Sequence, residues 1–283
     1  MRRSLALATI VTLLPLAALG CGGARPAAPT TPPPAADAPA GGAPPIATIG
    51  DKAEHVCQSE DDAAVAHFNR GVDRFDQGDA AAAIDAYKAA IAIDADYCDA
   101  IDNLALIYRR EGRLDEAIAL YERSLAIAPH NQFAWQNVGV AYRMRGRHAD
   151  AMRAYRQLAA LSPANPEGWF GVAQMALMAH QAAEARDAAR RAEALYVAAG
   201  SPLVDDARLL LGFAAIALAD WPTVRATLEP QYAKLASDAE VNLALGKAYL
   251  EPDALDRAKA RQYLQRARDL GATVTDALWQ RAR

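Results

Sequence analysis

The chain has 283 residues, of which 53% are hydrophobic and only 7% aromatic, so alanine and leucine supply most of the apolar mass and favour helices. Its formal net charge is -4, and acidic and basic residues are interspersed along the sequence. Without a long basic run, nucleic acid is disfavoured as a partner.

Residues 1–20 have the organisation of an export signal. Arg2 and Arg3 precede an apolar run that ends with Ala18-Leu19-Gly20, directly before Cys21. The run is shorter than the about 20 apolar residues that a membrane span needs, so we expect a cleaved signal. The ending Ala18-Leu19-Gly20-Cys21 resembles a bacterial lipoprotein box, which implies lipidation of Cys21. An ordinary secretory signal with a cysteine near its cleavage point is the alternative.

Residues 21–50 are expected to form a lipid-anchored, disordered tether, because proline, alanine and glycine dominate the segment and aromatic residues are absent from it. In polyproline conformation this tether would reach roughly 90 Å at about 3.1 Å per residue. Gly22 follows the cysteine in place of the aspartate that retains lipoproteins at the inner membrane. The resemblance therefore implies the outer membrane, with the folded part facing the periplasm.

Residues 51–283 contain a pattern that is repeated at a spacing of 34. The first copy comprises Ile101, Leu104, Ala105, Tyr108, Gly112, Ala117, Tyr121 and Pro129, and the second comprises Trp135, Val138, Gly139, Tyr142, Gly146, Ala151, Tyr155 and Pro163. A fixed period of this size indicates a stacked array of helix pairs. Small residues permit close helix packing, Gly112 and Gly146 suit helix ends, and Pro129 and Pro163 stop the second helix of each pair.

This pattern resembles the tetratricopeptide repeat. The resemblance implies an all-α solenoid wound as a right-handed superhelix. Extending the register in both directions predicts about six units, with His180 at the glycine position of the fourth, a break between Tyr196 and Asp206, and an insertion near Pro252. A C-terminal capping helix is expected around residues 275–283, where its arginines would give the array a polar end.

Two further cysteines, Cys57 and Cys98, are predicted to form a disulfide. Cys57 lies just before the first unit and Cys98 opens the second, so both fall near the starts of neighbouring first helices. An exported protein enters an oxidising compartment, where two thiols within reach tend to pair. Two buried structural thiols are the alternative.

No combination of residues indicates catalysis or metal binding. The five histidines lack metal-ligand spacing, the acidic residues around Asp99 lack the glycine and glutamate of a calcium loop, and no nucleophile motif is present. We expect no catalytic residue, metal or cofactor, and therefore no enzyme.

The resemblance implies a peptide-binding groove along the first helices. Asn69, Asn103 and Asn137 recur at one position of successive units, and their amides match the hydrogen-bonding groups of an extended peptide. Neighbouring groove positions hold Phe68, Phe75, Asp102, Leu106, Arg109, Phe133, Gln136, Arg143 and Phe170. The competing interpretation is that these asparagines only stabilise the fold.

A second, apolar site is predicted across the later units, where it would use Leu209, Phe213, Ile216 and Leu243. The alternative is that a tightly wound superhelix buries these side chains.

Together these features predict a non-enzymatic scaffold or adaptor of the bacterial cell envelope, with a protein or peptide partner in the groove and a membrane contact through Cys21. The alternative is a pilotin-like lipoprotein that assists secretin assembly for type IV pili or secretion. A third hypothesis is a ligand-binding or enzymatic role in cell-wall metabolism.

Overall fold

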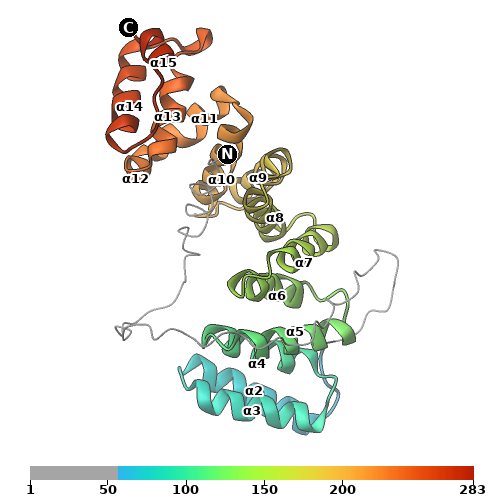
Figure 1. The fold of residues 1–283 in the computed structure, drawn as a ribbon. Coiled ribbons are helices and arrows are strands. Elements are labelled where there is room, and N and C mark those ends of the chain that lie inside the picture. Colours follow the sequence, from blue (N-terminus) through green and yellow to red (C-terminus); the bar gives the residue numbers. More distant parts are fainter. Residues whose placement is uncertain (1–56) are drawn as a thin grey trace.

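The computed structural model describes residues 57–283, and every element in this part of the chain is helical. The predicted signal, Cys21 and the tether lie outside the described residues. Helix pairs follow one another along a curved row, from α2 and α3 at one end to α14 and α15 at the other (Figure 1). No helix within residues 57–283 is both long and apolar enough to cross a membrane.

Six antiparallel pairs form the array, which agrees with the predicted number of units. The pairs are α2 (Asp62–Asp76) with α3 (Ala80–Ile93), α4 (Cys98–Arg110) with α5 (Leu114–Ile127), α6 (Gln132–Met144) with α7 (His148–Leu161), α8 (Pro166–Met178) with α9 (Ala182–Ala198), α10 (Val204–Leu218) with α11 (Trp221–Leu228), and α13 (Ala239–Ala248) with α14 (Arg257–Asp269). Short elements interrupt or close the row: η1 (Glu229–Gln231), α12 (Tyr232–Leu235), η2 (Pro252–Ala254) and α15 (Asp276–Arg281).

The predicted turns lie between the helices of a pair. Gly112 and Gly146 have φ angles of 79° and 81°, in the left-handed region that glycine adopts at little cost. The turn after α4 is closed by the backbone N–H of Arg113, which donates to the Tyr108 carbonyl over 2.9 Å. His180 adopts a φ of 58° at the equivalent place in the fourth pair, so the turn forms there without glycine.

Close packing between pairs centres on buried tyrosines. Tyr155 of α7 lies between α6 and α8, and a Cβ built on Gly139 or Gly171 would come within 2.8 or 2.3 Å of its ring. Glycine at these two positions therefore lets both first helices approach the same ring. The second helix of one pair contacts the first helix of the next, which produces a main hydrophobic core along the row. Ala192, Tyr196 and Ala207 form a small second cluster between α9 and α10.

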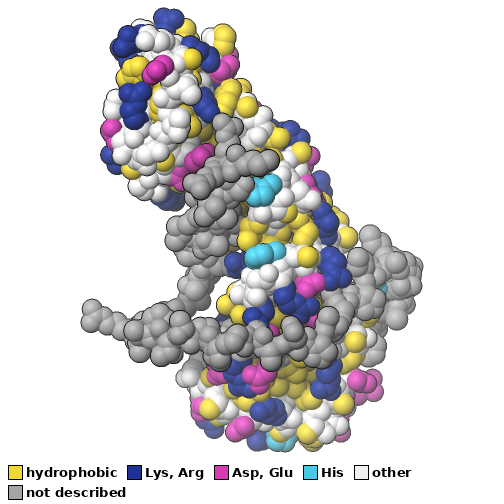
Figure 2. Space-filling model, viewed as in Figure 1, with side chains coloured by type: hydrophobic (Ala, Val, Ile, Leu, Met, Phe, Trp, Pro, Cys, Tyr) yellow, Lys and Arg dark blue, Asp and Glu magenta, His cyan; other side chains and the backbone are white. Residues whose placement is uncertain are grey.

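The C-terminal closing helix is confirmed as α15. Trp279 of α15 lies under the guanidinium of Arg268, 4.6 Å from the ring centroid, and Arg281 donates to the Leu250 carbonyl over 3.3 Å. Exposed arginines of α14 and α15 surround these contacts, and Lys and Arg side chains gather over this end of the molecule (Figure 2). The predicted insertion near Pro252 corresponds to η2.

Candidate protein-binding groove

The first helices of the second to fifth pairs form one continuous side of the solenoid, because α4 contacts α6, α6 contacts α8, and α8 contacts α10. The helical period places one set of side chains of each first helix on this side and directs the others into the core. We call this surface the first-helix face. It comprises Phe68, Asn69, Val72 and Phe75 of α2, Asn103, Leu106, Arg109 and Arg110 of α4, Phe133, Gln136, Asn137, Val140, Arg143 and Met144 of α6, and Phe170 of α8.

The three asparagines of the predicted ladder have different environments. Asn69 is exposed. Asn103 Nδ2 donates to the Asp99 carbonyl over 2.8 Å, and Asn137 Nδ2 donates to the Phe133 carbonyl over 2.9 Å. Asn137 is only 8% exposed, and its Oδ1 accepts from Arg109 Nη2 at 3.3 Å. Two of the three amides thus hydrogen-bond their own helix through Nδ2, and Asn137 has its Oδ1 engaged by Arg109 as well.

The aromatic residues of the face divide into one exposed ring and three supported rings. Phe133 is 45% exposed, and Met144 on the same face of α6 is 49% exposed. Phe68 packs on Tyr97 with ring centroids 5.1 Å apart, Phe75 lies under the Arg110 guanidinium at 4.9 Å, and Phe170 meets Tyr196 edge-on at 6.1 Å. Phe133 and Met144 are accordingly the largest apolar contacts that this face offers.

The polar members Arg109, Gln136 and Arg143 are half-buried. Arg109 spans from α4 to α6 through its bond to Asn137. Both arginines leave a buried Nε without a hydrogen-bond partner among the described residues.

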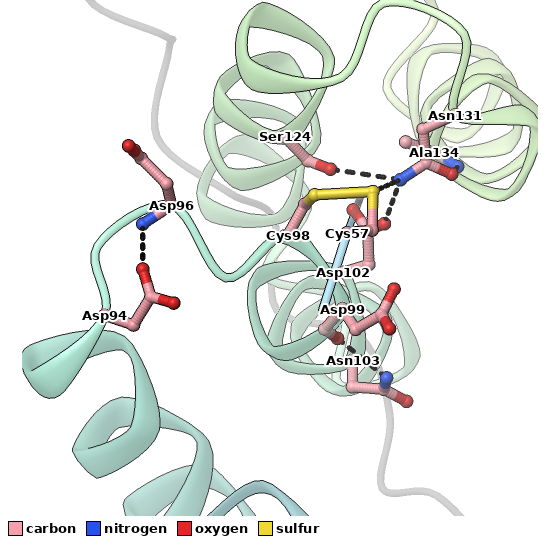
Figure 3. The surroundings of a disulfide bond; sticks show 10 residues. All are labelled: Cys57, Asp94, Asp96, Cys98, Asp99, Asp102, Asn103, Ser124, Asn131 and Ala134. Carbon is pink, nitrogen blue, oxygen red and sulfur yellow. Dashed lines mark hydrogen bonds between the residues drawn. A yellow bond between two sulfur atoms is a disulfide. The ribbon is translucent and has the colours of Figure 1, made fainter. Parts of the chain in front are cut away.

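Asp102 does not belong to the groove, so this prediction is wrong. Its side chain is 2% exposed and turns toward α5 and the turn before α6 (Figure 3). Asn131 Nδ2 lies 2.6 Å from Asp102 Oδ2, 3.3 Å from Ser124 Oγ and 3.6 Å from Cys57 Sγ. The other carboxyl oxygen, Oδ1, is buried without a partner in the described structure.

Burial raises the pKa of Asp102 to about 7, although hydrogen bonds from Ser124 and Asn131 act in the opposite direction.

Asn131 also caps α6, since its Oδ1 accepts from the Ala134 N–H over 3.1 Å. Sequence reasoning missed this polar cluster. An asparagine before a helix signals a cap, but nothing in the sequence indicates that its amide meets residues from two other elements.

Cys57 and Cys98 are joined in a disulfide, with Cα atoms 4.8 Å apart (Figure 3). The Cys57 carbonyl accepts from the Asp99 N–H over 3.0 Å. These bonds hold the segment before α2 against the start of α4, as the predicted pairing requires.

The second, apolar site predicted in the later part of the array is not an exposed patch. Leu209 and Phe213 are 5% and 2% exposed, and Ile216 and Leu243 are half-buried against the core. Winding of the later pairs therefore buries these side chains. Among residues 57–283 no cluster of three or more His, Cys, Asp and Glu is arranged to hold a metal ion.

The stacked helix pairs define the fold, an all-α solenoid of the tetratricopeptide-repeat type. Residues 96–164 match the family model described as tetratricopeptide repeat, which covers the two best copies of the pattern. No curated protein matches the chain by sequence.

Three solved structures with similar folds are informative. A tetratricopeptide repeat protein from Parabacteroides merdae is 17% identical, with 78% of this chain and 99% of that chain covered and a TM-score of 0.53. YrrB, described as a TPR protein with an unusual peptide-binding site, is 16% identical over 69% of this chain and 96% of its own, with a TM-score of 0.55. Pseudomonas aeruginosa PilF is 18% identical over 77% and 95%, with a TM-score of 0.55. At these identities the likeness shows the fold alone.

Proposed function

We propose that this protein is a non-enzymatic, lipid-anchored adaptor of the bacterial cell envelope that binds a protein partner on its first-helix face. The observation that carries the proposal is the composition of that face on α6. Phe133 and Met144 are about half exposed there, while the half-buried Arg143 and Gln136 supply a charge and an amide on the same face. Exposed apolar anchors next to polar groups are typical of protein interfaces.

The anchor and the compartment belong to the same proposal. The lipoprotein box around Cys21 and the proline-rich segment after it would attach the solenoid to the outer membrane, facing the periplasm. The proximity of Cys57 and Cys98 supports export, because paired cysteines persist in oxidising compartments.

The partner is sought by crosslinking in intact cells, followed by purification of the membrane-bound protein and mass spectrometry. The variant F133A/M144A is expected to lose most of the captured partner with an almost unchanged melting temperature, because both side chains are largely solvent-exposed. Leu255→Ala is the matched control, since Leu255 is 51% exposed but lies outside the first-helix face. Equal capture by wild type and F133A/M144A would remove this face as the binding site.

The asparagine ladder is tested separately with N103A/N137A. Weaker partner capture with an unchanged melting curve would support a binding role. Loss of stability with intact capture would make the asparagines structural, which their bonds to Asp99 and Phe133 also permit.

A narrower candidate is a pilotin-like lipoprotein that assists secretin assembly for type IV pili or secretion. It rests on the combination of a lipoprotein box with about six repeats, and the fold shared with PilF is compatible with it. Recovery of a secretin in the crosslinking experiment, together with loss of secretin multimers on deletion of the protein, would favour this candidate over the general adaptor. Retention of a glycan fragment by the purified protein would instead favour a role in cell-wall metabolism.

A further inference from the structure

The buried carboxyl of Asp102 lies beside the disulfide, and the proposed binding of a partner makes no use of it. Cys98 and Asp102 are four residues apart on α4, so their side chains share one face of the helix, one turn from each other. Asn131 belongs to the same cluster, because its Nδ2 lies 2.6 Å from Asp102 Oδ2 and 3.6 Å from Cys57 Sγ. Figure 3 shows the carboxyl and the disulfide together at this amide. The fold therefore places an acid next to a disulfide.

The two cysteines differ in their access to solvent. Cys98 is fully buried, whereas Cys57 is half-buried. An external thiolate therefore reaches the Cys57 sulfur more readily, and attack there expels Cys98 as the leaving group. A thiolate in a desolvated position is unfavourable, so the leaving sulfur needs a proton.

Asp102 is placed to supply that proton. Its Oδ1 is buried without a hydrogen-bond partner among the described residues, while its Oδ2 meets Asn131. Burial raises the pKa of Asp102 to about 7, so about half of the molecules carry this proton at neutral pH. Once the proton has left, hydrogen bonds from Ser124 and Asn131 stabilise the carboxylate.

Other titratable groups near Asp102 come from α4, α5 and the turn before α6. Asp99 of α4 raises the pKa of Asp102 further through its negative charge. Burial raises the pKa of Tyr121 of α5, and the charge of Asp102 adds to that rise, so the phenol stays protonated at neutral pH. His130 precedes Asn131 in the turn, and histidine ordinarily changes its charge between pH 5 and 8, so it requires a control.

We propose that dithiol reductants open the Cys57–Cys98 disulfide with Asp102 as the proton donor to Cys98. A thiolate of the reductant attacks Cys57 Sγ, the S–S bond breaks, and the carboxyl proton of Asp102 passes to Cys98 Sγ. The second thiol of the reductant, as its thiolate, then attacks the mixed disulfide and releases Cys57, which takes up a proton from solvent. The dithiol is oxidised to a cyclic disulfide, the protein gains two thiols, and Asp102 recovers its proton from solvent.

This reaction would make the first two helix pairs responsive to both reductant and pH. In the oxidised protein, the disulfide and the bond from the Asp99 N–H to the Cys57 carbonyl hold the segment before α2 against α4. Reduction removes the covalent link between them. Because protonation of Asp102 sets the rate, the link opens faster at acidic pH. The inference goes beyond the proposed function and holds whatever partner the first-helix face binds.

The test measures reduction of the full-length protein in detergent by dithiothreitol at pH 6 and pH 8. Samples are quenched with acid and alkylated, and mass spectrometry quantifies the peptide that contains alkylated Cys98. Each rate is divided by the concentration of dithiothreitol thiolate, which removes the pH dependence of the reductant itself. The wild-type rate constant should fall about tenfold from pH 6 to pH 8, because the protonated fraction of Asp102 falls from about nine tenths to about one tenth.

The variant D102N removes the acid and keeps the size of the side chain. Its rate constant should be equal at pH 6 and pH 8 and, at pH 6, about tenfold or more below that of wild type. A carboxylate that only repels the leaving thiolate would instead leave D102N as fast as wild type at pH 6, which would overturn the proposal. A wild-type rate constant that does not fall between pH 6 and pH 8 would overturn it as well.

Two further variants assign the pH dependence to Asp102. Ser124→Ala should move the fall in rate to higher pH, because the hydrogen bond from Ser124 lowers the pKa of Asp102. His130→Gln should keep the wild-type profile, and a profile that disappears in His130→Gln but survives in D102N would contradict the assignment.

Reduction through global unfolding has the opposite pH dependence. The buried carboxyl of Asp102 makes wild type less stable relative to D102N as the pH rises, so unfolding would expose the disulfide of wild type more often at pH 8. A wild-type rate constant that rises relative to that of D102N between pH 6 and pH 8 would therefore overturn the proposal.

Discussion

At the scale of single residues, Asp102 shows how position in a repeat can mislead. Its spacing from Asn103 and Leu106 places it near the groove on a helical projection, but the side chain is buried among Asn131, Ser124 and the disulfide. The direction of a side chain at the edge of a helical face depends on which neighbouring helix offers it a partner. Here α5 and the turn before α6 supply those partners, and the sequence of α4 contains no sign of them.

Asp102→Asn is expected to change how stability depends on pH. The pKa rises from 3.8 to about 7 on folding, so the folded protein binds the proton more tightly than the unfolded chain. Asp102 therefore makes its most favourable contribution below pH 3.8 and becomes increasingly unfavourable as the pH rises toward 7.

Urea unfolding at pH 4 and pH 8 measures this effect. Relative to wild type, Asp102→Asn should gain more free energy of unfolding at pH 8 than at pH 4, by up to about 4 kcal/mol from the size of the shift. A difference between the two proteins that is the same at both pH values would contradict a raised pKa for Asp102. Ser124→Ala is a suitable control, because it removes a donor and leaves the carboxyl in place.

At the scale of elements, the helix boundaries follow from local chemistry. Glycine closes the turns after α4 and α6, and polar residues cap the starts of several helices, such as Asn131 before α6 and Asp238 before α13. These signals are contained in short stretches of sequence, which explains why the turns and the closing helix could be predicted. The exact packing of α12 and η1 could not, because they interrupt the 34-residue register that guides the prediction.

The disulfide is expected to stabilise the first two pairs. It joins Cys57 to Cys98 across 41 residues, so the chain-entropy model predicts about 4 kcal/mol. The variant C57S/C98S should unfold at lower urea concentration than the oxidised wild type by a corresponding amount.

Reducing agent provides the control for this prediction. It should lower the stability of wild type toward that of C57S/C98S and leave the variant unchanged. If oxidised wild type and variant unfold alike, the cysteines contribute as ordinary buried side chains, which was the alternative from sequence.

At the scale of the whole molecule, the solenoid and its predicted attachment are separate properties. The described residues form the stacked pairs, whereas the proposed anchor lies at Cys21, outside them. The tether that the sequence predicts, which would span up to roughly 90 Å in polyproline conformation, would allow the solenoid to reach partners at a distance from the membrane.

Cys21→Ser is expected to move the protein from the membrane fraction to the soluble periplasmic fraction, because lipidation requires the thiol. Cell fractionation with immunoblotting measures the distribution, and Cys57→Ser serves as the control for the loss of a cysteine elsewhere. Unchanged membrane partitioning of Cys21→Ser would rule out lipidation of this residue as the anchor.

The sequence by itself determined the repeating unit, the turns and the approximate number of helix pairs, because each depends on residues close together in the chain or at a fixed period. The resemblance to the tetratricopeptide repeat further predicted Arg109, Arg143 and Phe133 as groove positions. Only the tertiary structure decided that Asp102 is buried, that Leu209 and Phe213 are covered, and that Arg109 and Arg143 form no ion pair within residues 57–283. Those properties depend on contacts between different helix pairs, and the periodic pattern within each pair does not specify them.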